Sequence, residues 1–318
     1  MNLENNKIEK TKFNNIKNKL NKTNIIKILK IIGTKLGKDM LKFCFKLLEV
    51  TLIFIFVCLF LNWSNNNIVL TEDTYVNEDI PSSFNGYKIL QISDFNNKSN
   101  ISKNLIEYTK KINPNIVVIT GDYINSERST EYNIDYSYIE EIIKKYPIYF
   151  ITGEQEYDSL CYKSFKTKLE KLGVEILENE KIELIENDEK INLIGLNDTS
   201  FFYENITKFK DTLKDLNTNK QFTILLSHRP ELIDIYTENN ISLVLAGHSL
   251  GGQINLPFVG ELYSSNQGFY PDYTKGFYKQ NKTTLYVSRG IGNTFIPIRL
   301  FNNPEINVIT LKNCKERN

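Results

Sequence analysis

The sequence is poor in residues on which several protein classes depend. Of its 318 residues only 2 are His, 4 are Cys and 1 is Trp, with 15 Gly and 8 Pro. So few cysteines exclude a fold stabilised by a framework of disulfide bonds. Gly and Pro are too scarce for a collagen-like or linker-like chain, and 41% hydrophobic residues is too many for a disordered one. One large globular domain or two ordinary ones fit this length.

The formal net charge of +1 hides two opposite regions. The first 46 residues contain 12 lysines but only three acidic residues, Glu4, Glu9 and Asp39. The rest of the chain therefore has an excess of acidic residues. This asymmetry indicates a basic arm joined to an acidic globule.

An apolar segment lies at the join. Residues 47–61 read LLEVTLIFIFVCLFL, and extension to Phe43 and Trp63 gives about 20 residues, the length that crosses a bilayer as a helix. Trp63 stands where an interfacial aromatic anchor is expected. A buried core helix is the alternative. A cleaved signal peptide fits badly, because the basic region before the segment is too long and no small-residue cleavage site follows it.

Lysine-rich flanks stay on the cytoplasmic side of a membrane, which predicts the orientation of the chain. We expect a basic cytoplasmic arm over 1–42, a single transmembrane anchor over 43–63 and a linker over 64–74. A globular domain over 75–312 and a tail over 313–318 then lie outside the cytoplasm.

The arm repeats apolar residues at helical spacing between its lysines, at Ile25, Ile28, Leu29, Ile32 and Leu36. Such a pattern is typical of a helix lying on anionic lipid. A solvated, disordered lysine-rich tail is the alternative. Membrane lipid is thus the expected partner, and nucleic acid is not, because the arm would sit against the membrane.

The globule alternates short apolar runs with amphipathic helical stretches. The runs are YKILQISD, NIVVITGD, IYFITGEQE, INLIGLND, FTILLSHRP, ISLVLAGHS, TTLYVSRG and INVITL. Runs of this length, rich in Ile, Val and Leu, predict strands buried on both faces. Helical patterns at 101–112, 138–146 and 165–172 separate several of them, which predicts an α/β fold with largely parallel pairing.

Polar residues stand at the C-terminal tips of five of these runs: Asp94, Asp122, Glu154, His228 and His248. Ligands of open α/β sheets bind beyond the carboxyl ends of the strands. A single acid at a strand tip commonly caps the next helix, but here both histidines of the chain join three acids. Carboxylates and imidazoles are ligands for a divalent metal.

These motifs resemble the calcineurin-like metallophosphoesterase family, and in particular its membrane-anchored bacterial phosphodiesterase-like branch. The family pattern runs D-x-H, G-D, G-N-H-[DE], a lone His after an apolar strand, and G-H-x-H. This chain reads SDFN at 93–96, GD at 121–122, GEQE at 153–156, SH at 227–228 and GHSL at 247–250. The resemblance covers about residues 75–311 and implies a four-layer α/β/β/α sandwich with a dinuclear metal site between its sheets.

Departures from the family pattern imply a degenerate site. At the first metal position Asp94 and Asp122 remain, but the two histidines are replaced by Asn96, a weak neutral ligand, and Leu250, which cannot bind a metal. At the second position Asp122, His228 and His248 remain, and Glu154 replaces an Asn. Gln155 occupies the place of the histidine that assists protonation of the leaving group, and Gln has no titratable proton near neutral pH.

We therefore expect at most one divalent ion, Mn, Zn or Fe, on Asp122, Glu154, His228 and His248, with Asp94 and Asn96 as further candidates. The expected protein is weakly active or catalytically silent and binds a partner or a phosphate-bearing envelope ligand at the outer membrane face. The alternative is a metal-dependent phosphodiester hydrolase that uses the surviving site, with Asp94 as base. A silent protein would need no metal.

Four smaller features complete the analysis. Arg229, Arg289 and Arg299 are candidates for contact with phosphate, although a loop arginine more often pairs with a nearby carboxylate. Asp198 is expected to be a turn or cap residue. Cys161 and Cys314 either pair or remain separate thiols. Residues 263–278, rich in Tyr, Gly and Asn, are expected to form a loop, either near the mouth of the site or elsewhere on the surface.

Overall fold

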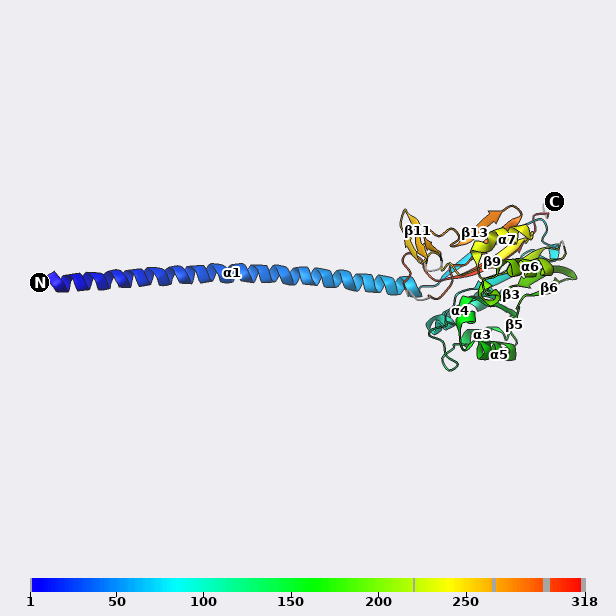
Figure 1. Ribbon diagram of the computed structural model, residues 1–318, viewed down its shortest axis with the longest axis horizontal. Coiled ribbons are helices and arrows are strands. Elements are labelled where there is room, and N and C mark those ends of the chain that lie inside the picture. The colour runs from blue at the N-terminus through cyan, green and yellow to red at the C-terminus, as the bar shows by residue number, and fades with distance from the viewer. Residues whose placement is uncertain (1, 220, 265–266, 294–297, 316–318) are drawn as a thin grey trace. The chain divides into compact units, whose positions relative to one another are not determined.

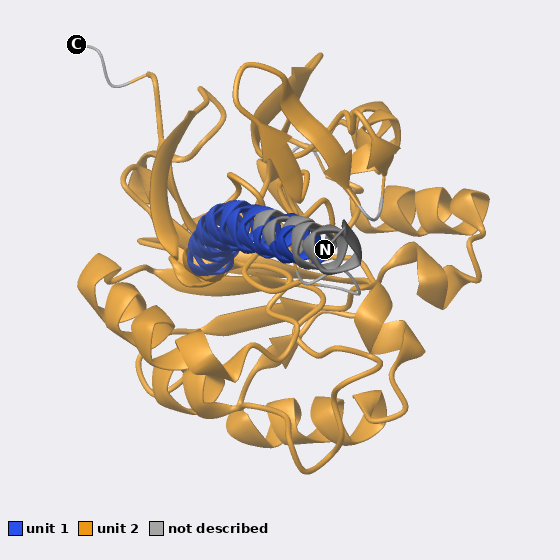
Figure 2. Ribbon diagram, turned by 90° about the vertical axis from the view of Figure 1, so that its left-hand side faces the viewer, with its two compact units in different colours: residues 1–60 blue, residues 61–318 orange. Residues whose placement is uncertain are grey.

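The computed structural model describes residues 2–219, 221–264, 267–293 and 298–315. The chain divides into two compact units, Met1–Phe60 and Leu61–Asn318, which are coloured separately in Figure 2.

Unit 1 is helical throughout its described length. It belongs to helix α1 (Asn2–Asn66), whose last residues lie in unit 2. No proline precedes Pro81, so nothing in the sequence interrupts the backbone hydrogen bonds of this helix. Within α1, the stretch Asn21–Asn66 is long and apolar enough to cross a membrane, and none of its apolar part is buried. The expected anchor over 43–63 lies inside this stretch.

Unit 2 contains two six-stranded mixed sheets (Figure 1). In the first sheet only β15 and β2 pair antiparallel, and all other neighbours pair parallel. Its strands, in spatial order, are β1 (Val69–Val76), β15 (Glu305–Lys312), β2 (Lys88–Ile92), β3 (Ile116–Thr120), β4 (Ile148–Ile151) and β5 (Glu175–Ile176).

The second sheet has parallel inner strands and an antiparallel pair at each edge. Its strands, in spatial order, are β13 (Gly276–Gln280), β14 (Thr283–Val287), β9 (Leu243–Ala246), β8 (Thr223–Leu226), β7 (Glu189–Gly195) and β6 (Glu180–Glu186). A separate antiparallel sheet contains β10 (Ile254–Leu256), β11 (Gly260–Ser264) and β12 (Gly268–Phe269).

Short helices connect the strands. The α-helices are α2 (Ser102–Ile112), α3 (Ser137–Ile142), α4 (Glu154–Asp158), α5 (Tyr162–Leu172), α6 (Ile206–Leu216) and α7 (Ile233–Glu238). Among the described residues, the 3-10 helices are η1 (Ser82–Phe84), η2 (Ser99–Ile101), η3 (Thr199–Phe202) and η4 (Pro230–Leu232). In Figure 1, α3 and α5 lie together, whereas α6 and α7 accompany β9 and β13.

Alternation along the strands divides the buried residues into three cores. Ile89 and Val118 of the first sheet share a core with Leu193 of the second, so the two sheets pack face to face. Neighbouring strand residues point the opposite way, because side chains alternate across a sheet. Leu90 and Ile119 thus pack against α2, α3 and α5, while the outer face of the second sheet packs against α6 and α7. The predicted α/β class with largely parallel pairing is confirmed, and each of the two large sheets also contains antiparallel pairs.

The structure differs from the sequence prediction where α1 meets unit 2. Residues 64–74 were expected to be a linker, but α1 continues to Asn66 and β1 begins at Val69. Strand β1 pairs with β15 over its full length, from Val69 opposite Glu305 to Val76 opposite Lys312. Polar residues dominate β1 because it is an edge strand with a partly exposed face, and this polarity hid it in the sequence.

Candidate metal centre

The candidate site lies at the carboxyl ends of strands from both sheets. Asp94 follows β2, Asp122 follows β3, His228 follows β8 and His248 follows β9. All four side chains are buried. Asp94, Asp122 and His248 also have positive φ angles of 51°, 55° and 67°. Such backbone is sparsely populated by non-glycine residues and is concentrated at functional sites.

Asp122, His228 and His248 form a compact set of metal donors. Each offers one ligand atom, and these atoms lie within 4.8 Å of one another. His228 Nε2 is 3.3 Å from Asp122 Oδ2, and the two imidazole rings are 5.0 Å apart. Two imidazoles and a carboxylate suit zinc-like divalent ions, and three protein ligands leave coordination positions open. The residues therefore fit a single divalent ion.

The backbone fixes the orientation of the His228 ring. His228 Nδ1 lies 2.7 Å from the carbonyl oxygen of Thr120, to which only a protonated nitrogen can donate. This contact directs Nε2 toward Asp122 and leaves it as the ligand atom. Burial lowers the pKa of His228, but the adjacent Asp122 carboxylate outweighs burial and raises it well above its usual value. Burial and the charge of His228 lower the pKa of His248.

Asp94 is held next to this group without belonging to it. Its Oδ2 accepts hydrogen bonds from Ser93 Oγ at 2.6 Å and from the backbone N–H of His248 at 3.2 Å. Its buried Oδ1 has no hydrogen-bond partner among the described residues. Burial raises the pKa of Asp94 to about 6, against the opposing charge of His228.

The three substituted family positions are occupied by other interactions. Asn96 Oδ1 accepts a hydrogen bond from Asn125 Nδ2 at 3.2 Å. Gln155 Oε1 accepts from Ser126, at 3.0 Å from its backbone N–H and 2.9 Å from its hydroxyl. Leu250 is fully buried. Its carbonyl oxygen accepts hydrogen bonds from the side chains of Arg299 and Asn302.

Glu154 lies outside the Asp122–His228–His248 group. It opens α4, its side chain is 40% exposed, and its Oε2 is 3.4 Å from Arg229 Nη2. The structure thus brings together three of the four ligands expected for the second metal position. The partly exposed Glu154 carboxylate instead lies beside the Arg229 guanidinium.

Sequence reasoning missed Glu156, which organises the Asp122 loop. This fully buried carboxylate accepts backbone N–H bonds from Asp122 at 2.7 Å, Gly153 at 2.7 Å and Ile124 at 3.1 Å. Burial, together with the nearby charge of Asp122, raises the pKa of Glu156 to about 7, although the three N–H groups oppose this shift. A glutamate at the third position of a predicted helix is a capping signal, which was available in GEQE.

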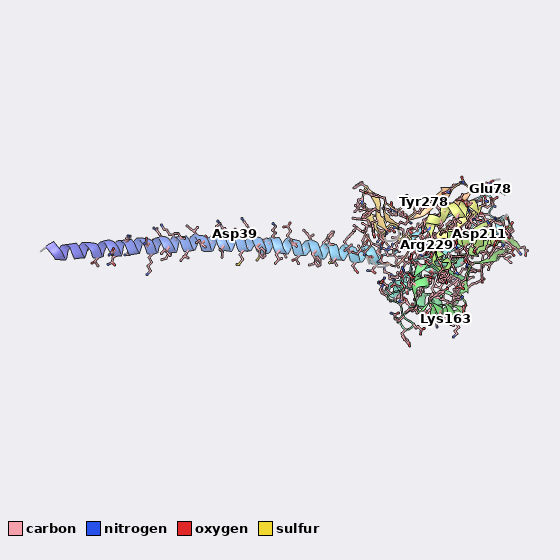
Figure 3. All side chains as sticks on the ribbon, viewed as in Figure 1. Asp39, Glu78, Lys163, Asp211, Arg229 and Tyr278 are labelled. Atoms are coloured by element: carbon pink, nitrogen blue, oxygen red, sulfur yellow. The ribbon has the colours of Figure 1, made fainter. Side chains whose placement is uncertain are left out.

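The three candidate arginines are each engaged within the fold. Arg229, labelled in Figure 3, forms a two-pronged pair with Asp198, with Nε and Nη2 at 2.8 and 2.9 Å from its two oxygens. Asp198 also accepts from the N–H of Ser200 as the cap of η3, as predicted. Burial raises the pKa of Asp198, but Arg229 holds it well below its usual range. Arg289 pairs with Glu305 at 2.6 Å.

Arg299 is also engaged, but it is fully buried and its guanidinium donates to neutral oxygens rather than to carboxylates. They belong to the backbone of Gly292, Arg289 and Leu250 and to the side chain of Asn293. Cys161 and Cys314, whose pairing was left open, are both free thiols, the first buried and the second exposed.

Comparison with known proteins agrees with this fold. The model of the calcineurin-like phosphoesterase family matches residues 87–252. The chain is 30% identical over 254 residues to the uncharacterized metallophosphoesterase YkuE of Bacillus subtilis, covering 77% of this chain and 86% of that protein. It is 31% identical over 274 residues to the uncharacterized metallophosphoesterase Cj0846 of Campylobacter jejuni, covering 84% and 70%.

A vertebrate protein of Danio rerio, the transmembrane protein with metallophosphoesterase domain, is 27% identical over 251 residues, covering 74% of this chain and 55% of that protein. The family match spans more than half of the chain. The chain therefore belongs to the calcineurin-like metallophosphoesterase family.

Proposed function

We propose that this chain is a membrane-anchored metallophosphoesterase-family protein that holds one divalent ion and binds a phosphate-bearing envelope ligand, with little or no phosphoester hydrolysis. Asp122, His228 and His248 hold the ion, which would supply the positive charge that attracts a phosphate. The observation that carries the proposal is the survival of this buried three-donor group beside Asn96, Leu250 and Gln155.

The surroundings of the substituted positions support weak or absent catalysis. Gln155 has no titratable proton, and its side-chain oxygen is already engaged by Ser126. The absence of a general acid removes a contribution of about 10²–10⁴ in rate. Leu250 offers no ligand atom, so the first metal position lacks a donor. With one divalent ion in place of two, the carboxylates of Asp94 and Asp122 leave the site less positive than a dinuclear site that binds phosphodiesters.

The anchor is proposed on the length and exposure of the apolar part of α1. The 12 lysines before residue 47 favour a cytoplasmic N-terminus, which places unit 2 outside the cytoplasm. The Danio rerio relative, whose name describes a transmembrane protein, supports attachment to a membrane.

The test of the metal site is the metal content of the full chain in lipid nanodiscs after loading with manganese or zinc. We expect about one equivalent, lost in His228→Ala and retained in the matched control Glu154→Gln, because Glu154 lies outside the donor group. Calorimetry with inorganic phosphate should then detect binding to the loaded protein and not to His228→Ala. Absence of bound metal in the folded wild-type protein would overturn the proposal.

A second candidate function is metal-dependent phosphodiester hydrolysis at the same three donors. The open coordination positions favour it, as does the buried Asp94 Oδ1, which has no partner among the described residues and is available as a base. Metal-dependent turnover of bis-(p-nitrophenyl) phosphate that is lost in both Asp94→Asn and His228→Ala would establish this alternative.

A further inference from the structure

Exposed apolar side chains gather around the small sheet β10–β12. We name the apolar tip after its six members: Phe258, Val259, Phe269, Tyr270, Ile298 and Phe301. All are exposed, and Phe258 is fully exposed in the turn between β10 and β11. Single exposed hydrophobic residues are ordinary, but a group this large marks an interaction surface.

Backbone strain within the apolar tip indicates that its side chains serve a purpose. Phe258, Tyr270 and Phe301 have φ angles of 68°, 54° and 50°, in the left-handed region that favours glycine. Of the described residues, Tyr203 is the other Phe, Tyr or Trp with a positive φ. A bulky aromatic residue in this backbone is unfavourable, and at Phe258 full exposure recovers no packing energy. Contact with an apolar environment outside the fold would compensate for both.

The apolar tip adjoins the end of α1. Leu300 bridges to Ile254 of β10, and the backbone N–H of the preceding Arg299 donates to Asn65 Oδ1 at 3.1 Å. Asn65 and Asn66 belong to unit 2 and are held there by Asn293 and Asn100, at 2.9 and 3.1 Å. In Figure 1, β11 lies at the same end of unit 2 as these last residues of α1.

Within unit 2, the last residues of α1 are followed closely by β1. Only Asn67 and Ile68 stand between α1 and β1, and Asn67 is itself bonded through its carbonyl oxygen to Asn303 Nδ2 at 3.2 Å. Trp63, half-exposed in the last turns of α1, is the kind of residue that lies at a bilayer interface. The apolar tip therefore lies at the part of unit 2 where the chain arrives from the proposed anchor.

Charge also favours a bilayer as the partner. Between Ile254 and Tyr270 the sequence has one charged residue, Glu261, and its carboxylate lies 2.7 Å from Lys275 Nζ. The apolar tip thus offers no unpaired carboxylate to repel anionic lipid. Transfer of exposed Phe and Val side chains from water into an apolar environment is favourable, and amphipathic segments bury their apolar side about 5–10 Å into the headgroup boundary.

From these observations we infer that the apolar tip inserts into the surface of the bilayer that α1 crosses, as a second contact of unit 2 with lipid. The inference rests on the membrane anchor proposed above.

The small sheet also contacts the candidate site through Ser249, which follows His248. The Ser249 hydroxyl accepts a hydrogen bond from Gln267 Nε2 at 2.8 Å, and the Ser249 carbonyl oxygen accepts one from the Ser264 hydroxyl. Insertion would hold the site close to the lipid headgroups.

The test uses the single native tryptophan of the full chain. Trp63→Phe/Phe258→Trp is reconstituted in nanodiscs whose lipids carry bromine on their acyl chains, which quenches tryptophan only near the hydrocarbon. The matched control is Trp63→Phe/Tyr203→Trp. Tyr203 is also an exposed aromatic residue with a positive φ, of 54°, but it lies between η3 and α6 rather than in the small sheet. Quenching should be several-fold stronger at position 258 than at position 203.

Equal quenching at positions 258 and 203 would overturn the inference. The fluorescence of Trp63 in the wild-type protein distinguishes this failure from failure of the anchor. If Trp63 is quenched and position 258 is not, the anchor is supported and the inference is rejected. If neither position is quenched, both are rejected. If position 258 is quenched only in discs that hold two or more chains, the apolar tip forms a contact between copies of the chain. That result would also overturn the inference.

Discussion

His228 Nδ1 donates to the carbonyl oxygen of Thr120 at 2.7 Å, so a strand of the first sheet orients a ring carried by the second. Gly121, the next residue, makes this approach feasible. It has φ +86°, and a Cβ built on it would lie 2.7 Å from His228 Nδ1 and 2.8 Å from the backbone of Gly153. A side chain at this position would collide with the His228 ring and with the backbone at the start of α4.

Gly121→Ala should therefore weaken metal binding. Loss of the contact that orients a ligating histidine lowers metal affinity by about 10–100-fold. We expect a shift of this size in the dissociation constant for manganese, measured by titration of the full chain in nanodiscs. The matched control is Gly173→Ala, since Gly173 has φ +90° but open space around its Cβ position. Equal affinity in both variants would contradict the role of Gly121.

Glu156→Gln should destabilise unit 2 and loosen the Asp122 loop. The carboxylate accepts three backbone N–H bonds, whereas an amide directs its own N–H₂ group at one of these donors. A buried unsatisfied donor costs about 1–3 kcal/mol. Urea unfolding of the full chain measures this loss. Glu178→Gln is the control, because Glu178 forms a partly exposed pair with Lys166 that contributes only about 0–1 kcal/mol. Similar losses in both variants would rule out a special role for Glu156.

Lys98 should make stability depend on alkaline pH. Burial lowers its pKa from 10.5 to about 7, so between about pH 7 and pH 10 the folded chain binds fewer protons than the unfolded chain. The free energy of unfolding then rises with pH in this window, by up to about 1.4 kcal/mol per unit. Denaturation of the full chain from pH 7 to 9.5 should show this slope, and Lys98→Met should remove it. The exposed Lys103→Met serves as control and should retain it.

Restoring the family motifs should restore hydrolysis. The variant carries Asn96→His, Glu154→Asn, Gln155→His and Leu250→His, which supply the missing donors and the proton donor. Turnover of bis-(p-nitrophenyl) phosphate should rise well above the wild-type background. The same variant without Leu250→His is the control, since Leu250 sits buried with φ +49° and is the hardest position to replace. A folded variant that binds two metals without turnover would show that the substrate pocket has diverged as well.

The sequence predicted the α/β class and the place of the site because both follow from short-range patterns. Apolar runs such as IVVIT and LVLA form strands β3 and β9, and the residues just after them, Asp122 and His248, converge at the carboxyl ends. Glu154 was not predictable in the same way. Its direction depends on Arg229, 75 positions further along the chain, and no local pattern reports such a contact.

Strand β1 was missed for a related reason. Its partner β15 lies more than 200 positions later in the sequence, so no local pattern indicates the pairing. An edge strand with a solvent-exposed face also lacks a continuous apolar run. The burial of Glu156 likewise depends on a turn assembled from β3 and β4, so its capping position alone did not reveal its three backbone contacts.

The pairing of β1 with β15 also constrains how the protein is made. Val69 of β1 pairs with Glu305 of β15, so β1 leaves the ribosome long before its partner strand is made. Strand β1 must therefore remain unpaired until residues 305–312 have been synthesised, and the first sheet closes only then. A chain that ends before residue 305 would leave β1 without its partner and β2 without its antiparallel neighbour, and would expose the edges of both strands to proteases.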